Sequence, residues 1–158
     1  MNKTIKSTIR MFKVAVRNFL LLRKAPKRAS RKEYWSFVLI SIPLLFSANL
    51  VSLILFRSLV LGLIFESIFY IILFHLSIRR CHDVGIISAP AYLSFLGTLL
   101  GVFITGDFQT DHVQQTAEFI DNIRQLTIVF GIVNIALFII TLLPGTPGKN
   151  RFGDKPTE

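Results

Sequence analysis

Two short segments of this 158-residue sequence contain most of the side chains that could do chemistry. Residues 28–35 read RASRKEYW, and residues 79–85 read RRCHDVG. Guanidinium groups make paired hydrogen bonds with carboxylates and with phosphate oxygens, so arginines beside acids indicate internal ion pairing or a site for an oxyanion. The candidate residues are Arg28, Arg31, Glu33, Arg79, Arg80, His82 and Asp83.

These residues have two alternative roles: a salt-bridged latch that joins helix ends, or a site for a lipid headgroup or phosphate. In the second segment, Arg79 and Asp83 are spaced i, i+4 and are expected to pair if the helix continues, with Gly85 at its C-cap. His82 and Asp83 are neighbours, and adjacent helical residues do not face one another as a catalytic pair would. Because no nucleophile motif accompanies them, we expect a protein that is not an enzyme, with no catalytic residue, cofactor or metal ligand.

A carboxylic acid stands inside an apolar run at Glu66. An ionised carboxylate near the bilayer centre costs on the order of 2.5–3.5 kcal/mol, so this side chain is expected to face a bundle interior or to be protonated. Counting along the helices at about 1.5 Å per residue places three other polar side chains at a similar depth. The expected intramembrane polar cluster is Asn49, Glu66, Thr98 and Asn134. The cluster either holds the bundle together by hydrogen bonds or uses Glu66 to carry a proton or a cation.

The elements that position these residues are long apolar segments. The chain is 52% hydrophobic, its formal net charge is +9 and its mean hydropathy is +0.58, values that fit apolar runs alternating with basic connections. A helix needs about 20 apolar residues to cross a bilayer. The expected transmembrane helices span about 36–56, 58–78, 88–106 and 126–143. The predicted fold is an all-α polytopic membrane protein with four transmembrane helices, and nucleic acid is not an expected partner.

The boundary between the first two spans is marked only by Arg57 and its neighbours. We expect a tight helical hairpin at this position. The alternative is a single tilted helix from 36 to 78, which would be far longer than the thickness of a bilayer.

The distribution of lysine and arginine predicts the orientation of the chain. Sixteen of the eighteen lie in the N-terminal segment, between the second and third spans, or in the tail, and all of these segments are on one side of the expected bundle. Only Arg57 and Arg124 fall on the other side, near Asp107, Asp111, Glu118 and Asp121. Cytoplasmic connections are rich in cations, so we expect a multi-pass protein with both termini in the cytoplasm.

Residues 1–27 form a basic arm that precedes a transmembrane domain at 28–158. One third of a helical wheel of this arm is apolar, and the neighbouring arc is basic. The apolar residues are Ile5, Ile9, Phe12, Val16, Phe19 and Leu20, and the basic ones are Lys3, Lys6, Arg10, Lys13 and Arg17. We expect an amphipathic helix lying on the anionic inner leaflet, each cation adding on the order of 1 kcal/mol. The alternative is a disordered basic leader that only determines topology.

A third segment, PGTPGKNRFG at 144–153, follows the last span. Its proline and glycine residues are expected to end the helix and make consecutive turns. Together the three segments resemble the bacterial inner-membrane proteins grouped as domain of unknown function 805, over about 28–156. Lys27 stands where that family usually has glycine, and Cys81 where it usually has leucine. The resemblance implies a small helical protein of the bacterial inner membrane and carries no established activity.

We therefore expect an accessory or scaffold subunit that binds anionic lipid headgroups of the phospholipid bilayer and a membrane protein partner or a second copy of itself. The alternative is a small transporter or channel component that uses the intramembrane carboxylate of Glu66.

Overall fold

The computed structural model describes residues 3–21, 25–57, 59–107 and 117–156, and these ranges contain five helices and no strand. The helices are α1 (Lys3–Leu21), α2 (Arg31–Phe56), α3 (Leu59–Val84), α4 (Ala89–Asp107) and α5 (Ala117–Leu142). Three of them contain stretches long and apolar enough to cross a membrane, and α4 contains a shorter apolar stretch. The predicted all-α polytopic membrane fold is confirmed.

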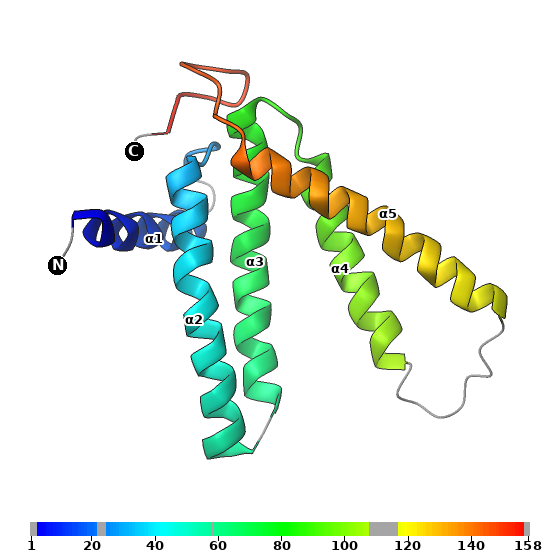
Figure 1. Ribbon diagram of the computed structural model, residues 1–158. Coiled ribbons are helices and arrows are strands. Elements are labelled where there is room, and N and C mark those ends of the chain that lie inside the picture. The colour runs from blue at the N-terminus through cyan, green and yellow to red at the C-terminus, as the bar shows by residue number, and fades with distance from the viewer. Residues whose placement is uncertain (1–2, 22–24, 58, 108–116, 157–158) are drawn as a thin grey trace.

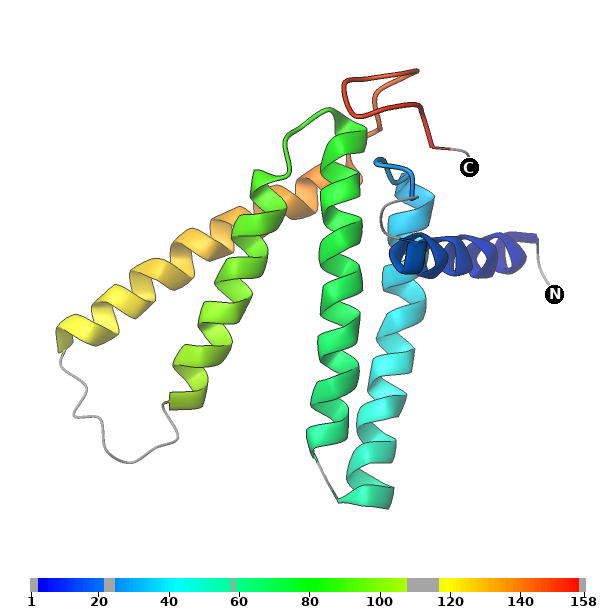
Figure 2. The same cartoon turned by 180° about the vertical axis from the view of Figure 1, so that it is seen from behind.

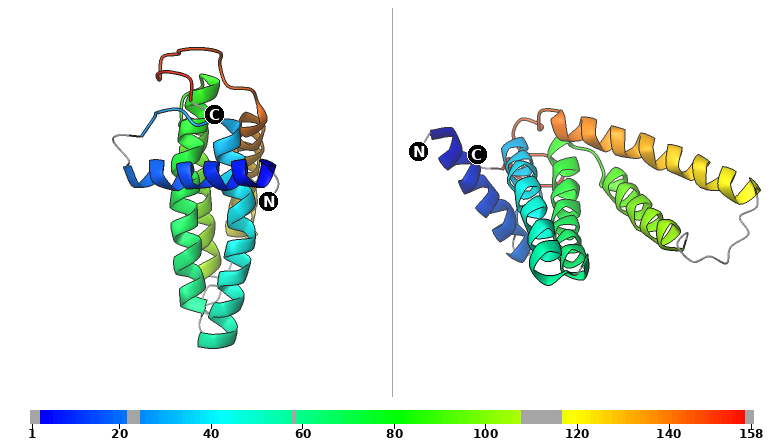
Figure 3. Two further views of the ribbon diagram at one scale, coloured as in Figure 1. Left: turned by 90° about the vertical axis from the view of Figure 1, so that its left-hand side faces the viewer. Right: turned by 60° about the horizontal axis from the view of Figure 1, so that its bottom comes forward.

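The four apolar helices form two antiparallel hairpins that meet at one end of the molecule. Helices α2 and α3 run side by side, while α4 and α5 form a second hairpin that diverges from the first (Figure 1 and, from behind, Figure 2). The start of α2, the end of α3 and the end of α5 lie together at the end nearest the C-terminus. The two views in Figure 3 show that α1 runs crosswise over α2 and α3.

The α2–α3 hairpin turns at Arg57, as expected. Its backbone is left-handed, with φ 47° and ψ 32°, and its N–H donates to the Ser52 carbonyl. This conformation ends α2 at Phe56, and α3 begins at Leu59. The alternative of one continuous helix is therefore wrong, because a left-handed residue cannot continue a right-handed helix.

The helices extend further than the apolar runs that predicted them. Helix α2 begins at Arg31 rather than near 36, and α3 continues to Val84 rather than ending near 78. Helix α5 begins at Ala117, well before the expected start near 126, while 108–116 lie outside the described residues. The hydrocarbon thickness limits only the apolar part of a helix, and a helix can continue beyond it into the polar region. These extensions place the charged residues of both segments on helix ends.

Most of the large apolar side chains in the spans point outward, including Phe46, Ile54 and Leu55, which are 67–70% exposed. The buried core is small and lies near the shared helix ends. Its two clusters are Ala15, Ala29, Tyr34, Phe37, Ile72 and Leu76, and Cys81, Ala91, Leu137 and Ile140. So much exposed apolar surface is stable only against lipid or against other membrane helices.

Helix α1 is ordered and has three faces, so the alternative of a disordered leader is wrong. One face packs on α2 and α3: Met11, Ala15 and Asn18 are buried, and the Phe12 ring stacks on Phe37 at 5.7 Å. A second face leaves Ile5, Ile9 and Leu20 exposed, and a third presents the five basic residues. Part of the apolar arc predicted from the sequence therefore packs against α2 and α3, and the rest points outward.

The α4–α5 contact depends on a glycine. A Cβ atom at Gly97 would overlap the Phe130 ring, whereas a Cβ at Gly131 on the facing helix would enter open space. We predict that Gly97→Ala lowers the free energy of unfolding by about 1–3 kcal/mol, because overpacking displaces the ring. The matched change Gly131→Ala should be stabilising by up to about 1 kcal/mol, because alanine favours a helix. Thermal unfolding in mild detergent measures both, and shifts of the same sign would contradict this packing.

Candidate functional site

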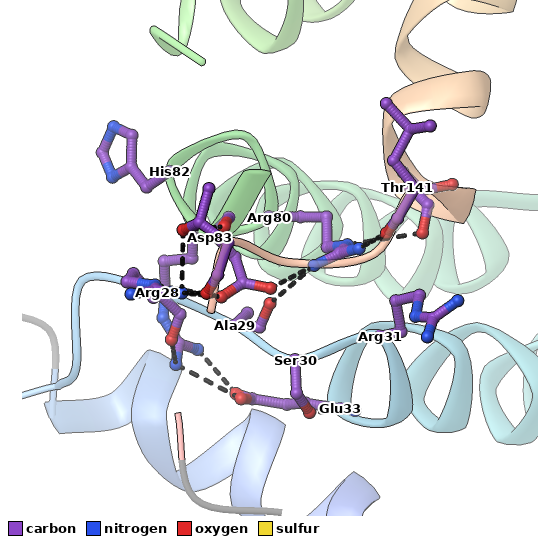
Figure 4. A network of polar contacts seen from close by, with 12 residues as sticks. Arg28, Ala29, Ser30, Arg31, Glu33, Arg80, His82, Asp83 and Thr141 are labelled. Atoms are coloured by element: carbon purple, nitrogen blue, oxygen red, sulfur yellow. Dashed lines mark hydrogen bonds and ion pairs between the residues drawn. The ribbon is translucent and has the colours of Figure 1, made fainter. Parts of the chain in front are cut away.

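The two charged segments predicted from the sequence meet at the shared helix ends (Figure 4). Arg28 pairs with Asp83 at 2.9 Å, Arg79 pairs with Glu33 at 2.6 Å, and Arg80 also pairs with Asp83. None of these five side chains is more than 5% exposed. We call this group the arginine latch; it consists of Arg28, Glu33, Arg79, Arg80 and Asp83.

The expected pairing of Arg79 with Asp83 is wrong. Arg79 instead reaches α2, where it donates to both oxygens of Glu33, and Asp83 accepts from Arg28 and Arg80. The i, i+4 rule describes helices whose side chains have no other partner. Here Arg79 forms a buried, charge-assisted ion pair with Glu33 of α2 in place of an ion pair with Asp83 within α3.

The first turn of α2 positions the Glu33 side chain within the arginine latch. Ser30 is the N-cap, with φ −70° and ψ 160°, and its hydroxyl accepts from the Glu33 N–H at 3.1 Å. The pattern Ser-x-x-Glu normally forms a capping box in which the glutamate turns back to the cap residue. In this protein the Glu33 carboxylate accepts from Arg79 and from the Asn18 amide of α1, the latter at 3.0 Å.

Arg28 connects α3 to the loop that follows α5. Its guanidinium donates to Asp83 at 3.0 Å, to the Thr146 carbonyl at 2.8 Å and to the Gly148 carbonyl at 2.6 Å. Gly145 lies so close to Asp83 that any Cβ there would overlap the carboxylate. The glycine is therefore what allows the loop to approach the latch.

Arg80 binds the C-terminal end of α5. It donates to the carbonyls of Thr141 and Leu143 as well as to Ala29, and its side chain is fully buried. The last carbonyls of a helix have no partner within the helix and carry the negative end of its dipole. The buried Arg80 guanidinium donates hydrogen bonds to these carbonyls and places a positive charge at the negative end of the dipole.

The end of α3 is capped by its own turn and by the 144–153 segment. Gly85 has φ 88°, and the Ile86 N–H donates to the Cys81 carbonyl at 2.9 Å, which completes a Schellman motif and confirms the expected C-cap. Thr146 N–H donates to the Asp83 carbonyl at 2.8 Å, and the Asn150 amide donates to the His82 carbonyl at 2.9 Å. The predicted end of the last helix before Pro144 is also confirmed.

Two of the sequence candidates lie outside the latch. Arg31 is exposed, and its nearest acceptor is the Leu142 carbonyl at 3.5 Å, a weak contact. His82 stacks on Phe152, with ring centroids 4.0 Å apart, and contacts the Lys27 carbonyl at 3.1 Å. In Figure 4 both side chains point away from the dashed network. Sequence reasoning did not identify Asn18, Thr146 or Asn150; the last two lie in a motif it singled out, while Asn18 gave no signal.

The electrostatics of the latch favour a structural role over a headgroup site. Three guanidinium groups face two carboxylates, and the excess positive charge is balanced by backbone carbonyls from three chain segments. Arg28, Arg79 and Arg80 are thus already bonded to protein acceptors. A phosphate could bind them only by displacing these buried hydrogen bonds, each of which is costly to leave unmade.

The four intramembrane candidates form two separate groups. The Asn49 amide donates to Glu66 across the α2–α3 hairpin at 3.0 Å, beside Gly62, where a Cβ would overlap the amide oxygen. Ser94 of α4 donates to Asn134 of α5 at 2.7 Å, and Thr98 donates to the Ser94 carbonyl at 3.0 Å. The depth estimate placed all four at one height, but each hairpin satisfies its own polar side chains.

Asp83 is the most informative residue to change. We predict that Asp83→Asn lowers the free energy of unfolding by about 3–5 kcal/mol, because it removes the charge shared by two buried arginines. The control is Asp154→Asn, since Asp154 is 87% exposed and lies 3.9 Å from an exposed lysine. Thermal unfolding in mild detergent should separate the two variants clearly. Equal stability of Asp83→Asn and the unmodified protein would show that the latch does not hold the fold together.

Comparison with known families agrees with this geometry. A family model described as "Protein of unknown function (DUF805)" matches residues 23–154. The match includes all five latch residues and the 144–153 segment. No curated protein and no solved structure matches the chain. The chain therefore belongs to the DUF805 family of proteins of unknown function.

Proposed function

We propose that this protein is a non-enzymatic accessory or scaffold subunit of the bacterial inner membrane, with both termini cytoplasmic, that binds anionic lipid and a membrane partner. The observation that carries the proposal is the position of α1. This helix is attached crosswise to the bundle while its five basic side chains and part of its apolar face remain exposed.

The attachment of α1 is specific. The Asn18 amide donates to Glu33 of the latch, and an aromatic stack continues from Phe12 through Phe37 to Phe69, with the second pair 5.4 Å apart. A helix that crosses membrane-spanning helices lies close to the membrane plane. Its exposed Ile5, Ile9 and Leu20 then suit the acyl boundary, and its cations suit anionic headgroups.

The cytoplasmic placement of this end follows from charge. Sixteen of the eighteen lysines and arginines lie in the segments at the latch end or in the N-terminal arm. Cation-rich connections stay on the cytoplasmic side of a membrane. This supports placing the latch, α1 and both termini at the inner leaflet.

A scaffold role fits the shape of the bundle. The latch joins the two hairpins at one end, and from there they diverge (Figure 1). Outward apolar side chains on both hairpins are available to lipid, to a second copy or to a partner helix. The latch residues supply ion pairs and bonds to helix ends, so the proposal is one of association without catalysis.

The lipid part of the proposal predicts a charge effect specific to α1. Neutralising Lys6 and Lys13 to glutamine should weaken phosphatidylglycerol binding by roughly tenfold or more, because each cation adds about 1 kcal/mol at an anionic surface. The control neutralises Lys149 and Lys155, two exposed lysines of the tail. Native mass spectrometry of the protein from nanodiscs of mixed phosphatidylglycerol and phosphatidylcholine counts the retained lipids. Equal loss in both double variants would contradict the assignment to α1.

The alternative is a small transporter or channel component that uses Glu66. The contact with Asn49 shows that this carboxyl group already has a partner within its own hairpin, which favours a structural role. We predict that Glu66→Gln leaves thermal stability and proton flux within error of the unmodified protein, because glutamine can still accept the Asn49 hydrogen bond. Flux is measured with a pH-sensitive dye in liposomes. A flux present in the unmodified protein and abolished by Glu66→Gln would replace the scaffold proposal with the transporter.

A further inference from the structure

A cavity of about 270 Å³ lies between the two hairpins, bounded by α3, α4 and α5 and by the start of α2. Its walls combine aromatic rings with polar groups at the Asn134 end and at the Tyr34 end. The aromatic rings come from Tyr34, Tyr70, Phe74, Phe95 and Phe138, and the polar groups from Ser77, Ser94, Thr98 and Asn134. The cavity is separate from the latch, and Glu66 does not line it.

A second cavity of about 290 Å³ lies next to the first. It lies between α4 and α5, and Thr98 and Asn134 line both cavities. Its remaining walls are almost wholly apolar and include Leu100, Phe130 and Gly131. Asn134 therefore has an aromatic-lined cavity on one side and a mainly apolar cavity on the other.

The walls of both cavities contain no charged side chain among the described residues. A phosphate or an ammonium group placed there would lack a counter-charge, and an unpaired buried charge is very costly. The occupant must then be neutral, with a few oxygen atoms to use the hydrogen-bonding groups. The anionic lipids proposed for α1 do not meet this condition.

Asn134 has hydrogen-bonding capacity to spare. Its amide donates one N–H to the Phe130 carbonyl at 2.8 Å, and its oxygen accepts from Ser94 at 2.7 Å. A carboxamide has two N–H donors and two acceptor lone pairs, so one donor and one lone pair remain for a ligand. The group best suited to that N–H is a carbonyl or hydroxyl oxygen.

The size of the space selects among neutral molecules. A dry cavity of about 150 Å³ accommodates benzene, so about 270 Å³ accommodates a ring with several substituents. A helix of a partner protein, at least about 10 Å across with its side chains, does not fit. Phe74 and Phe95, which both line the cavity, stack on one another with ring centroids 4.3 Å apart.

We propose that the paired cavities bind a neutral amphiphile whose ring-shaped head carries carbonyl or hydroxyl oxygens, the chemistry of the isoprenoid quinones, with the head bound at Asn134 and the tail between α4 and α5. This site is independent of the scaffold role proposed above. It would give the protein a specific ligand drawn from the hydrocarbon phase.

The chain contains its own reporter for this site. Trp35 is the sole tryptophan, and its ring packs edge-on against Phe138, a cavity residue, at 5.9 Å. Quinones quench indole fluorescence at short range. Titration of the full-length protein in phosphatidylcholine nanodiscs with decylubiquinone should therefore give saturable quenching, above the linear background of quinone dissolved in lipid.

Two variants test the head and the tail separately. Asn134→Leu should weaken the saturable quenching by about tenfold for decylubiquinone and for the tail-less analogue 2,3-dimethoxy-5-methylbenzoquinone. Gly131→Leu adds a large side chain at a residue that lines the second cavity, and it should weaken only decylubiquinone. The control is Ser67→Ala, an exposed serine bonded to its own helix at the Leu63 carbonyl, which should change neither titration.

Competition identifies the chemical class. Excess diacylglycerol, a neutral lipid with carbonyl groups but no ring, should displace the quinone poorly, and phosphatidylglycerol should not displace it at all. Linear quenching without saturation in the unmodified protein would overturn the proposal, as would equal quenching in Asn134→Leu or effective displacement by phosphatidylglycerol. If Asn134→Leu does not fold, Ser94→Ala tests the same end of the cavity and Gly131→Leu still tests the tail.

Discussion

The architecture depends on the ion pairs that the Asp83 carboxylate makes with two arginines. This carboxylate accepts from Arg28, which precedes α2, and from Arg80 on its own helix, and Arg80 in turn binds the end of α5. Burying charges costs several kcal/mol per ion unless every partner is in place. The latch is therefore stable only as a complete unit, and a complete unit joins three helix ends that lie far apart in the sequence.

This constraint acts at one end of the molecule only. Along α2 and α3 the helices are kept together by the close approach at Gly62 and the Asn49–Glu66 contact. The two hairpins lie close together near the latch. Away from the latch, the α4–α5 hairpin diverges from the α2–α3 hairpin (Figure 1). The cavity beside Asn134 follows from that divergence. A tightly packed four-helix bundle would have filled it with side chains.

Hydropathy predicted the all-α class, the hairpin at Arg57 and the segments that meet at the helix ends, because hydrocarbon thickness and helix geometry leave few choices. The pairing within the latch could not be predicted in the same way. Spacing along α3 suggested Arg79 with Asp83, but Arg79 pairs with Glu33 of α2, and Asp83 pairs with Arg28 as well as with Arg80 of its own helix. Residue counting likewise placed Asn49, Glu66 and Asn134 at a similar depth without saying which helices would be neighbours. Asn18 was missed because an amide on an amphipathic helix shows its role only once the helix has docked.

The three charged or glycine-rich segments, at 28–35, 79–85 and 144–153, all lie within the range that the family model matches and supply the arginine latch and the loop that caps it. Their residues are occupied by one another, with buried guanidinium groups bonded to carboxylates and carbonyls of the same chain. A motif used in this way specifies how helices are joined. The groups with unused bonding capacity lie elsewhere, in the exposed face of α1 and at Asn134 in the cavity. It follows that an activity of this protein is to be sought first in the surfaces that the latch positions, since most of the latch's own N–H groups are already bonded within the chain.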